Sequence, residues 1–186
     1  IGYPRWRNQA HPLNVPLVLI AGNGGGRWYN FFQESWQSQG PNYRHLLVKG
    51  TREPLAIYQC TPEHARSDAN MEITGAEYVS IYGVKGEYYQ PMVSVRDRDH
   101  IRIFGYGGNA AAHESRSLFT ITNAPNYLVA NLIDSPRFPG KGAPERFSGD
   151  RVDPRLWHML RDEPSEGAAL NTMPLDRPVL VRRGAQ

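Results

Sequence analysis

Between Met71 and Asp134, hydrophobic and polar residues alternate in a pattern that occurs three times. In the first copy Met71, Ile73, Val79 and Ile81 are apolar, and most of the residues between them are polar. A period of two is typical of half-buried β-strands and does not produce the apolar face of a helix. Each copy therefore predicts short strands separated by turns.

The copies are close enough in length to indicate a solenoid. Ile73, Val95 and Ile121 occupy the same position in successive copies, 22 and 26 residues apart, and a weaker copy contains Val48. Repeats of this length that return to the same position predict stacked coils of parallel strands. The residues expected to stack are Ile73, Val95 and Ile121 in the first strand, and Val79, Ile101 and Tyr127 in the second.

Two columns of turn residues accompany the strands. Glycine, asparagine and aspartate tolerate a left-handed backbone, so both columns predict tight corners with positive φ. The first column is Gly50, Gly75, Asp97 and Asn123, and the second is Gly83, Gly105 and Asn131.

This pattern resembles the right-handed parallel β-helix of the pectate-lyase-like superfamily, which includes polysaccharide lyases and glycoside hydrolases. The resemblance covers roughly residues 46 to 134 and implies an all-β fold. Since a solenoid needs caps over its apolar ends, we expect this chain to be the C-terminal half of a longer coil. An upstream segment, or a separate chain of the same protein, would then complete it.

The rest of the chain is expected to flank the coils. Residues 1–45 form a lead-in that contains a buried strand at 16–21 and an aromatic loop. Residues 135–186 form a tail packed on the coil, with a helix at 155–161 and a last strand at 178–182. Variable loops at 59–70, 86–91 and 107–117 are expected on the binding side. These loops hold His64, Glu87, Tyr88, Tyr89 and His113.

Composition narrows the classes of function. The net charge of +3 is spread along the chain without a basic run, which suits an acidic glycan better than nucleic acid. The single cysteine, Cys60, excludes an internal disulfide, and no segment is apolar for long enough to span a membrane. Together with the resemblance, this predicts a secreted or periplasmic protein.

The resemblance implies that the outward positions of the strands carry the active site. Neither outward column holds stacked carboxylates, so the sequence shows no cluster of oxygen ligands for calcium and no carboxyl pair for a glycosidase. What remains is cationic and aromatic, and it suits β-elimination on a uronic acid, which needs a base and positive charge near the carboxylate. The same residues could equally serve solubility and strand packing.

We therefore predict a polysaccharide lyase or glycoside hydrolase acting on an acidic glycan in an open groove; the alternative is a non-catalytic carbohydrate-binding or adhesive module. No cofactor is identified, although the resemblance allows calcium. The candidate catalytic residues are Asp99, His100, Lys85 and Arg102. The candidate substrate-binding residues are Trp28, Tyr29, Trp36, Tyr82, Arg96 and Phe104. Of these, Tyr82, Arg96, Arg102 and Phe104 are expected to share one face of the coil.

Overall fold

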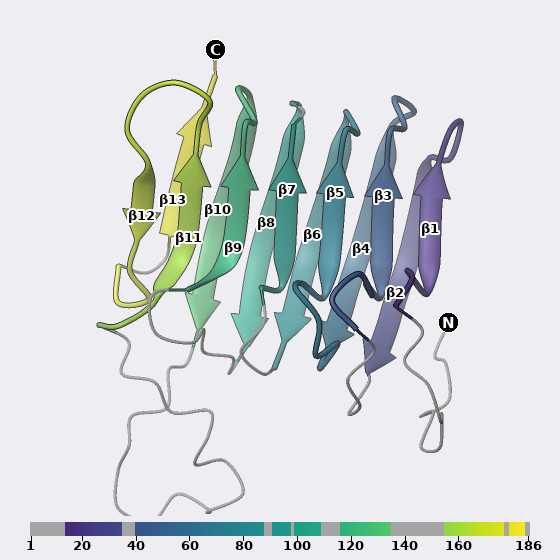
Figure 1. Ribbon diagram of the computed structural model, residues 1–186, viewed down its shortest axis with the longest axis horizontal. Coiled ribbons are helices and arrows are strands. Elements are labelled where there is room, and N and C mark those ends of the chain that lie inside the picture. Colours follow the sequence, from purple (N-terminus) through teal and green to yellow (C-terminus); the bar gives the residue numbers. More distant parts are fainter. Residues whose placement is uncertain are drawn as a thin grey trace, which may run out of the picture.

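The protein is a solenoid of about four turns, built of β-strands that are mostly parallel (Figure 1). The computed structural model contains no helix among the residues that it describes. These described residues are 14–34, 40–87, 91–97, 99–108, 116–134, 155–176 and 179–184.

The strands form two sheets that face each other across the core. In Figure 1 the chain rises through the near sheet, returns through the far sheet and advances from β1 toward β11, which makes a right-handed coil. The seven-stranded sheet contains β1 (Val18–Ala21), β3 (Leu46–Lys49), β5 (Met71–Thr74), β7 (Val93–Arg96), β9 (Ser117–Thr122), β11 (His158–Glu163) and β12 (Leu170–Thr172). The six-stranded sheet contains β13 (Val179–Arg183), β10 (Tyr127–Asp134), β8 (Ile101–Gly108), β6 (Val79–Gly86), β4 (Leu55–Glu63) and β2 (Gly26–Glu34).

The predicted register is confirmed in both sheets. Val95 pairs with Ile73 on one side and with Ile121 on the other. Ile101 likewise lies between Val79 and Tyr127. All six side chains are buried, so like residues of successive coils stack into one continuous apolar core.

Both predicted columns of left-handed residues are confirmed as well. In the second column Gly83 and Gly105 each have a φ of 77°, and Asn131 has a φ of 59°. Asn30 and Gln59 occupy the same column on β2 and β4, with φ of 53° and 59°. The first column also has positive φ throughout, at Gly50, Gly75, Asp97 and Asn123.

The second column bends the strands without ending them. Tyr82 pairs with Phe104 and Val84 with Tyr106, while the left-handed residue between them drops out of the pairing, as in a β-bulge. The extra residue resets the alternation, so that Tyr82 and Gly83 both face outward and Val84 faces the core. The predicted loops at 59–70, 86–91 and 107–117 therefore begin too early, because β4 continues to Glu63 and β8 continues to Gly108.

The predicted helix at 155–161 is wrong. His158–Glu163 is the strand β11, which pairs in parallel with β9. Seven residues are too few for a helix that packing does not support. As a strand, the segment instead buries Trp157, Met159 and Leu160 over the end of the apolar stack.

Parallel pairing extends beyond residues 46–134 in both directions, from β1 on β3 to β11 on β9. At the C-terminal end the direction changes, since β12 and β13 pair antiparallel with β11 and β10. The described residues include no helix that could cross a membrane.

Replacing Gly105 by valine should destabilise the protein by more than about 1 kcal/mol, because a β-branched residue is strained at positive φ. Space is not the cause, since the nearest atom to an added Cβ is the Gly83 Cα at 3.9 Å. Gly107→Val is the matched control, because Gly107 lies two residues away on the same strand with nothing within 4 Å of its added Cβ. Urea unfolding measures both changes; equal stabilities for the two variants would contradict the turn assignment.

Candidate functional site

A ladder of stacked aromatic rings runs across the outer face of the six-stranded sheet. Tyr29, Tyr58, Tyr82 and Phe104 occupy equivalent positions on β2, β4, β6 and β8. Their ring centroids are 5.1, 5.0 and 5.3 Å apart, and neighbouring planes differ by 10° to 12°. Tyr29 is 61% exposed and Tyr82 is 38% exposed, so the ladder is open to solvent.

The rings cover each other's faces, and this determines what the ladder can bind. An inner ring such as Tyr58 has a neighbour on both sides and presents mainly its edge to solvent. A phenol edge can exchange hydrogen bonds through its hydroxyl, while an open ring face favours apolar stacking. Tyr29 has a ring neighbour within the ladder on one side, because β2 is the edge strand of its sheet.

Two arginines flank the ladder on one side. Arg27 and Arg102 are exposed and lie two residues before Tyr29 and Phe104, respectively. They occupy equivalent positions on β2 and β8, because the strand register pairs Arg27 with Ala56, Ala56 with Ser80 and Ser80 with Arg102. Three strand spacings place them about 14 Å apart along the coil axis. Such guanidinium groups can hold carboxylates or sulfates with two hydrogen bonds each.

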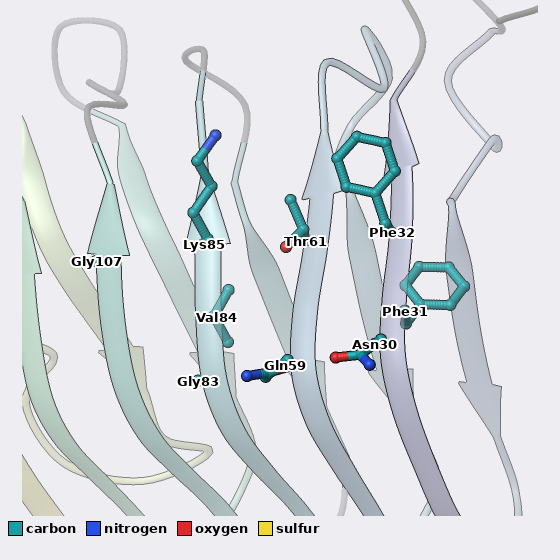
Figure 2. A pocket seen from close by; sticks show the side chains of 9 residues that line it. All are labelled: Asn30, Phe31, Phe32, Gln59, Thr61, Gly83, Val84, Lys85 and Gly107. Carbon is teal, nitrogen blue, oxygen red and sulfur yellow. The ribbon is translucent and has the colours of Figure 1, made fainter. Parts of the chain in front are cut away.

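On the other side of the ladder the sheet surface is hollowed into an open depression of about 500 Å³. Figure 2 shows the Asn30 and Gln59 side chains at the same level on neighbouring strands, with Phe32, Thr61 and Lys85 further along. The depression is lined by Asn30, Phe31, Phe32, Gln59, Thr61, Gly83, Val84, Lys85 and Gly107. Its lining combines amides, a hydroxyl and a cation, which are groups that can hydrogen-bond a polar ligand.

Beyond the depression, carboxylates are aligned across the sheet. Glu34 on β2 pairs with Glu63 on β4, and extending the β4–β6 register places Glu87 beside Glu63 in the next coil. Lys85 forms ion pairs with Glu63 and, at 2.8 Å, with Glu87. The Nδ1 atom of His64 is 3.5 Å from Glu34 Oε1, and its Nε2 atom is 4.0 Å from Glu87 Oε2. We call these five residues the acid–base cluster.

Burial controls the proton affinities in the acid–base cluster. Burial raises the pKa of Glu63, although the adjacent Lys85 opposes the shift. Burial also lowers the pKa of His64, against the opposing effect of Glu34 and Glu87, so neutral imidazole is favoured. For Lys85, burial lowers the pKa, but its ion pairs with Glu63 and Glu87 outweigh that effect and the pKa rises. Glu63 therefore takes up a proton more readily than an ordinary glutamate, and Lys85 holds its proton more firmly than an ordinary lysine.

A buried hydrogen-bond chain supports the cluster from inside the coil. His45 Nε2 is 2.7 Å from the carbonyl oxygen of Glu63, and His45 Nδ1 is 2.8 Å from the hydroxyl of Tyr43. Because a carbonyl can only accept, Nε2 of the neutral ring must donate and Nδ1 must accept from Tyr43. Burial lowers the pKa of His45 to about 4, which keeps the ring neutral.

The structure distributes the sequence-predicted candidates over several places. Tyr29, Tyr82 and Phe104 meet in the ladder, with Arg102 beside it, whereas Trp28 packs against the core. Lys85 belongs to the acid–base cluster. Arg96 ends β7 in the other sheet, so the expected single face does not include it. Trp36 lies outside the described residues, as do Tyr88, Tyr89 and His113.

Asp99 and His100 form a separate pair at the start of β8. His100 Nδ1 is 2.8 Å from Asp99 Oδ1, and the His100 ring lies 4.8 Å from that of Tyr78. His100 precedes Ile101, whereas Lys85 pairs with Gly107 at the other end of the bent strand. The structure therefore does not bring the four predicted catalytic residues together.

Sequence reasoning missed Glu34 and Glu63 and found no stacked carboxylates. Both residues lie on the strand segments that follow the left-handed residue, where the alternation has changed phase. Aligning Glu34, Glu63 and Glu87 by their distance from Asn30, Gln59 and Gly83 would have revealed the column, because each glutamate lies four residues further on.

A scan against protein-family models, a search of curated proteins and a search of solved structures find no match to this chain. The structure itself establishes the fold class of the protein, which is a solenoid of parallel β-strands.

Acid should destabilise the protein through His45. The unfolded chain binds more protons than the folded one between the ordinary pKa of 6.5 and the folded value of about 4, so stability is lost as the pH falls through this window. The shift corresponds to at most about 3 kcal/mol. His45→Gln retains one donor and one acceptor without titrating, so its unfolding free energy, measured in urea, should vary less over this range. If the unfolding free energy of the two proteins depended on pH in the same way, the assignment would be contradicted. The raised pKa of Glu63 has the opposite effect on stability, but it is present in both proteins and cancels in the comparison.

Proposed function

We propose that the protein binds a polysaccharide along the outer face of the six-stranded sheet. The observation that carries the proposal is the open ladder from Tyr29 to Phe104, bordered by an open depression that contains the Asn30 and Gln59 amides. An extended polymer needs an open surface that repeats along its length. The solenoid supplies this surface, because each coil repeats the same outward positions about 4.8 Å further along the axis.

The charges beside the ladder favour an acidic glycan. Arg27 and Arg102 are exposed on the side of the ladder away from the carboxylates, where they can hold uronate or sulfate groups. The phenol edges and the amides of Asn30 and Gln59 offer hydrogen bonds to sugar hydroxyls. A ligand of this kind fits a secreted or periplasmic protein.

Degradation of the same glycan is the second candidate, and the acid–base cluster favours it. Glu63, with its raised pKa, would donate a proton, and Glu34 is the neighbouring carboxylate in the register. The Glu63 and His64 side chains are only 5% and 3% exposed, which makes binding the better supported function. Incubation with acidic and neutral polysaccharides, followed by assays for reducing ends and unsaturated uronates, separates the two. Products formed by wild type and lost in Glu63→Gln would establish the enzyme.

Removing ladder hydroxyls should weaken glycan binding and leave the fold intact. The double variant Tyr58→Phe, Tyr82→Phe keeps the stacked rings but loses two hydroxyl groups, so we expect at least tenfold weaker binding of an acidic oligosaccharide with little change in melting temperature. Isothermal titration calorimetry measures the affinity.

The matched control is Tyr78→Phe, which removes a hydroxyl from a tyrosine that is 47% exposed and lies outside the ladder. Its affinity should equal that of wild type. Equal affinities for the double variant and wild type, or an equal loss in the control, would place the binding surface elsewhere.

A further inference from the structure

Three side chains of the acid–base cluster converge in the manner of metal ligands. One donor atom each from Glu34, Glu63 and His64 lie within 4.8 Å of one another. The two glutamates come from paired positions on β2 and β4, and His64 directly follows Glu63. The backbone of Glu63 is held by its pairing with β2 and by the buried His45.

A second observation points to a ligand at this place. Glu63 is 96% buried, and its Oε1 atom accepts no well-formed hydrogen bond among the described residues. The group touching that oxygen is the ammonium of Lys85, whose side chain is 49% exposed. A buried carboxylate oxygen needs a cation beside it, and the half-exposed Lys85 ammonium takes that place when no metal ion is bound.

The carboxyl groups gathered around Glu63 favour a cation. Glu34, Glu63 and Glu87 bring three carboxyl groups to this place, and the Lys85 ammonium lies against two of them, Glu63 and Glu87. Arg66, which acts on His64 electrostatically, is exposed. Carboxylates held close together repel one another, and a divalent cation relieves this repulsion.

The donor set selects the kind of cation. Two carboxylates and one imidazole suit zinc and similar transition metals, whereas calcium requires six to eight oxygen ligands. A metal-binding histidine usually directs its second nitrogen toward a carboxylate, and Glu87 lies 4.0 Å from Nε2 while Glu34 lies 3.5 Å from Nδ1.

We propose that Glu34, Glu63 and His64 form a binding site for a zinc-like divalent metal ion, with Lys85 as the competing cation. Lys85 can leave the site at low cost because about half of its side chain is already in solvent. The metal site does not depend on glycan binding.

Titration calorimetry of the full chain with Zn²⁺ alone tests the proposal, with Ca²⁺ as the comparison ion. We expect one Zn²⁺ per chain and at least tenfold weaker Ca²⁺ binding. Glu63→Gln and His64→Asn should each weaken Zn²⁺ binding at least tenfold; asparagine is chosen because His64 has a φ of 57°. Lys85→Met should strengthen binding several-fold, and a misfolded variant would not show such a gain.

The matched control is His100→Asn, which also removes a histidine at positive φ, 56°, beside a carboxylate. Its Zn²⁺ affinity should equal that of wild type. The proposal is overturned if neither wild type nor Lys85→Met binds Zn²⁺, if Glu63→Gln and His64→Asn bind it like wild type, or if His100→Asn loses as much affinity as they do.

Discussion

The left-handed residue in the middle of each long strand is the constraint on which the outer face depends. At Asn30, Gln59, Gly83, Gly105 and Asn131 the backbone takes positive φ and drops out of the ladder of pairs. Because one residue is added without a partner, the alternation restarts, and two successive residues face outward in every coil. The aromatic ladder lies immediately before this column. The depression and the carboxylates follow it, so the column separates two chemically different strips of one surface.

The two strips differ in how far water reaches them, and this difference assigns their roles. The ladder and its flanking arginines are open, and they carry no covering segment among the residues that the structure describes. The carboxylate strip is covered where β4 ends, and there burial raises the pKa of Glu63 and lowers that of His64. Low dielectric makes charges at such a place expensive unless a counter-ion is present. The open ladder suits a long polar ligand, and the buried carboxylate and imidazole of Glu63 and His64 suit a small cation.

The repeat in the sequence was enough to predict the solenoid, its register and the corner residues, because burial fixes a period of two and positive φ selects glycine, asparagine or aspartate. The carboxylate column could not be found from that period, because the bulge shifts the phase of the alternation before Glu63 is reached. In addition, Glu34 and Glu63 are 29 positions apart in the sequence. Residues 155–161 were predicted as a helix, because local composition does not show that Trp157 must cover the end of an apolar stack. The grouping of Lys85 with His64 likewise depends on tertiary contact across coils.

The central claim is that the outer face of the six-stranded sheet is the ligand-binding surface. A crystal structure with the oligosaccharide that binds most tightly in a glycan screen tests it most directly. The account predicts sugar density that runs along the coil axis across β2, β4 and β6, in contact with Tyr58 and Tyr82. Sugar density on the seven-stranded sheet, or on the six-stranded sheet away from Tyr58 and Tyr82, would contradict it.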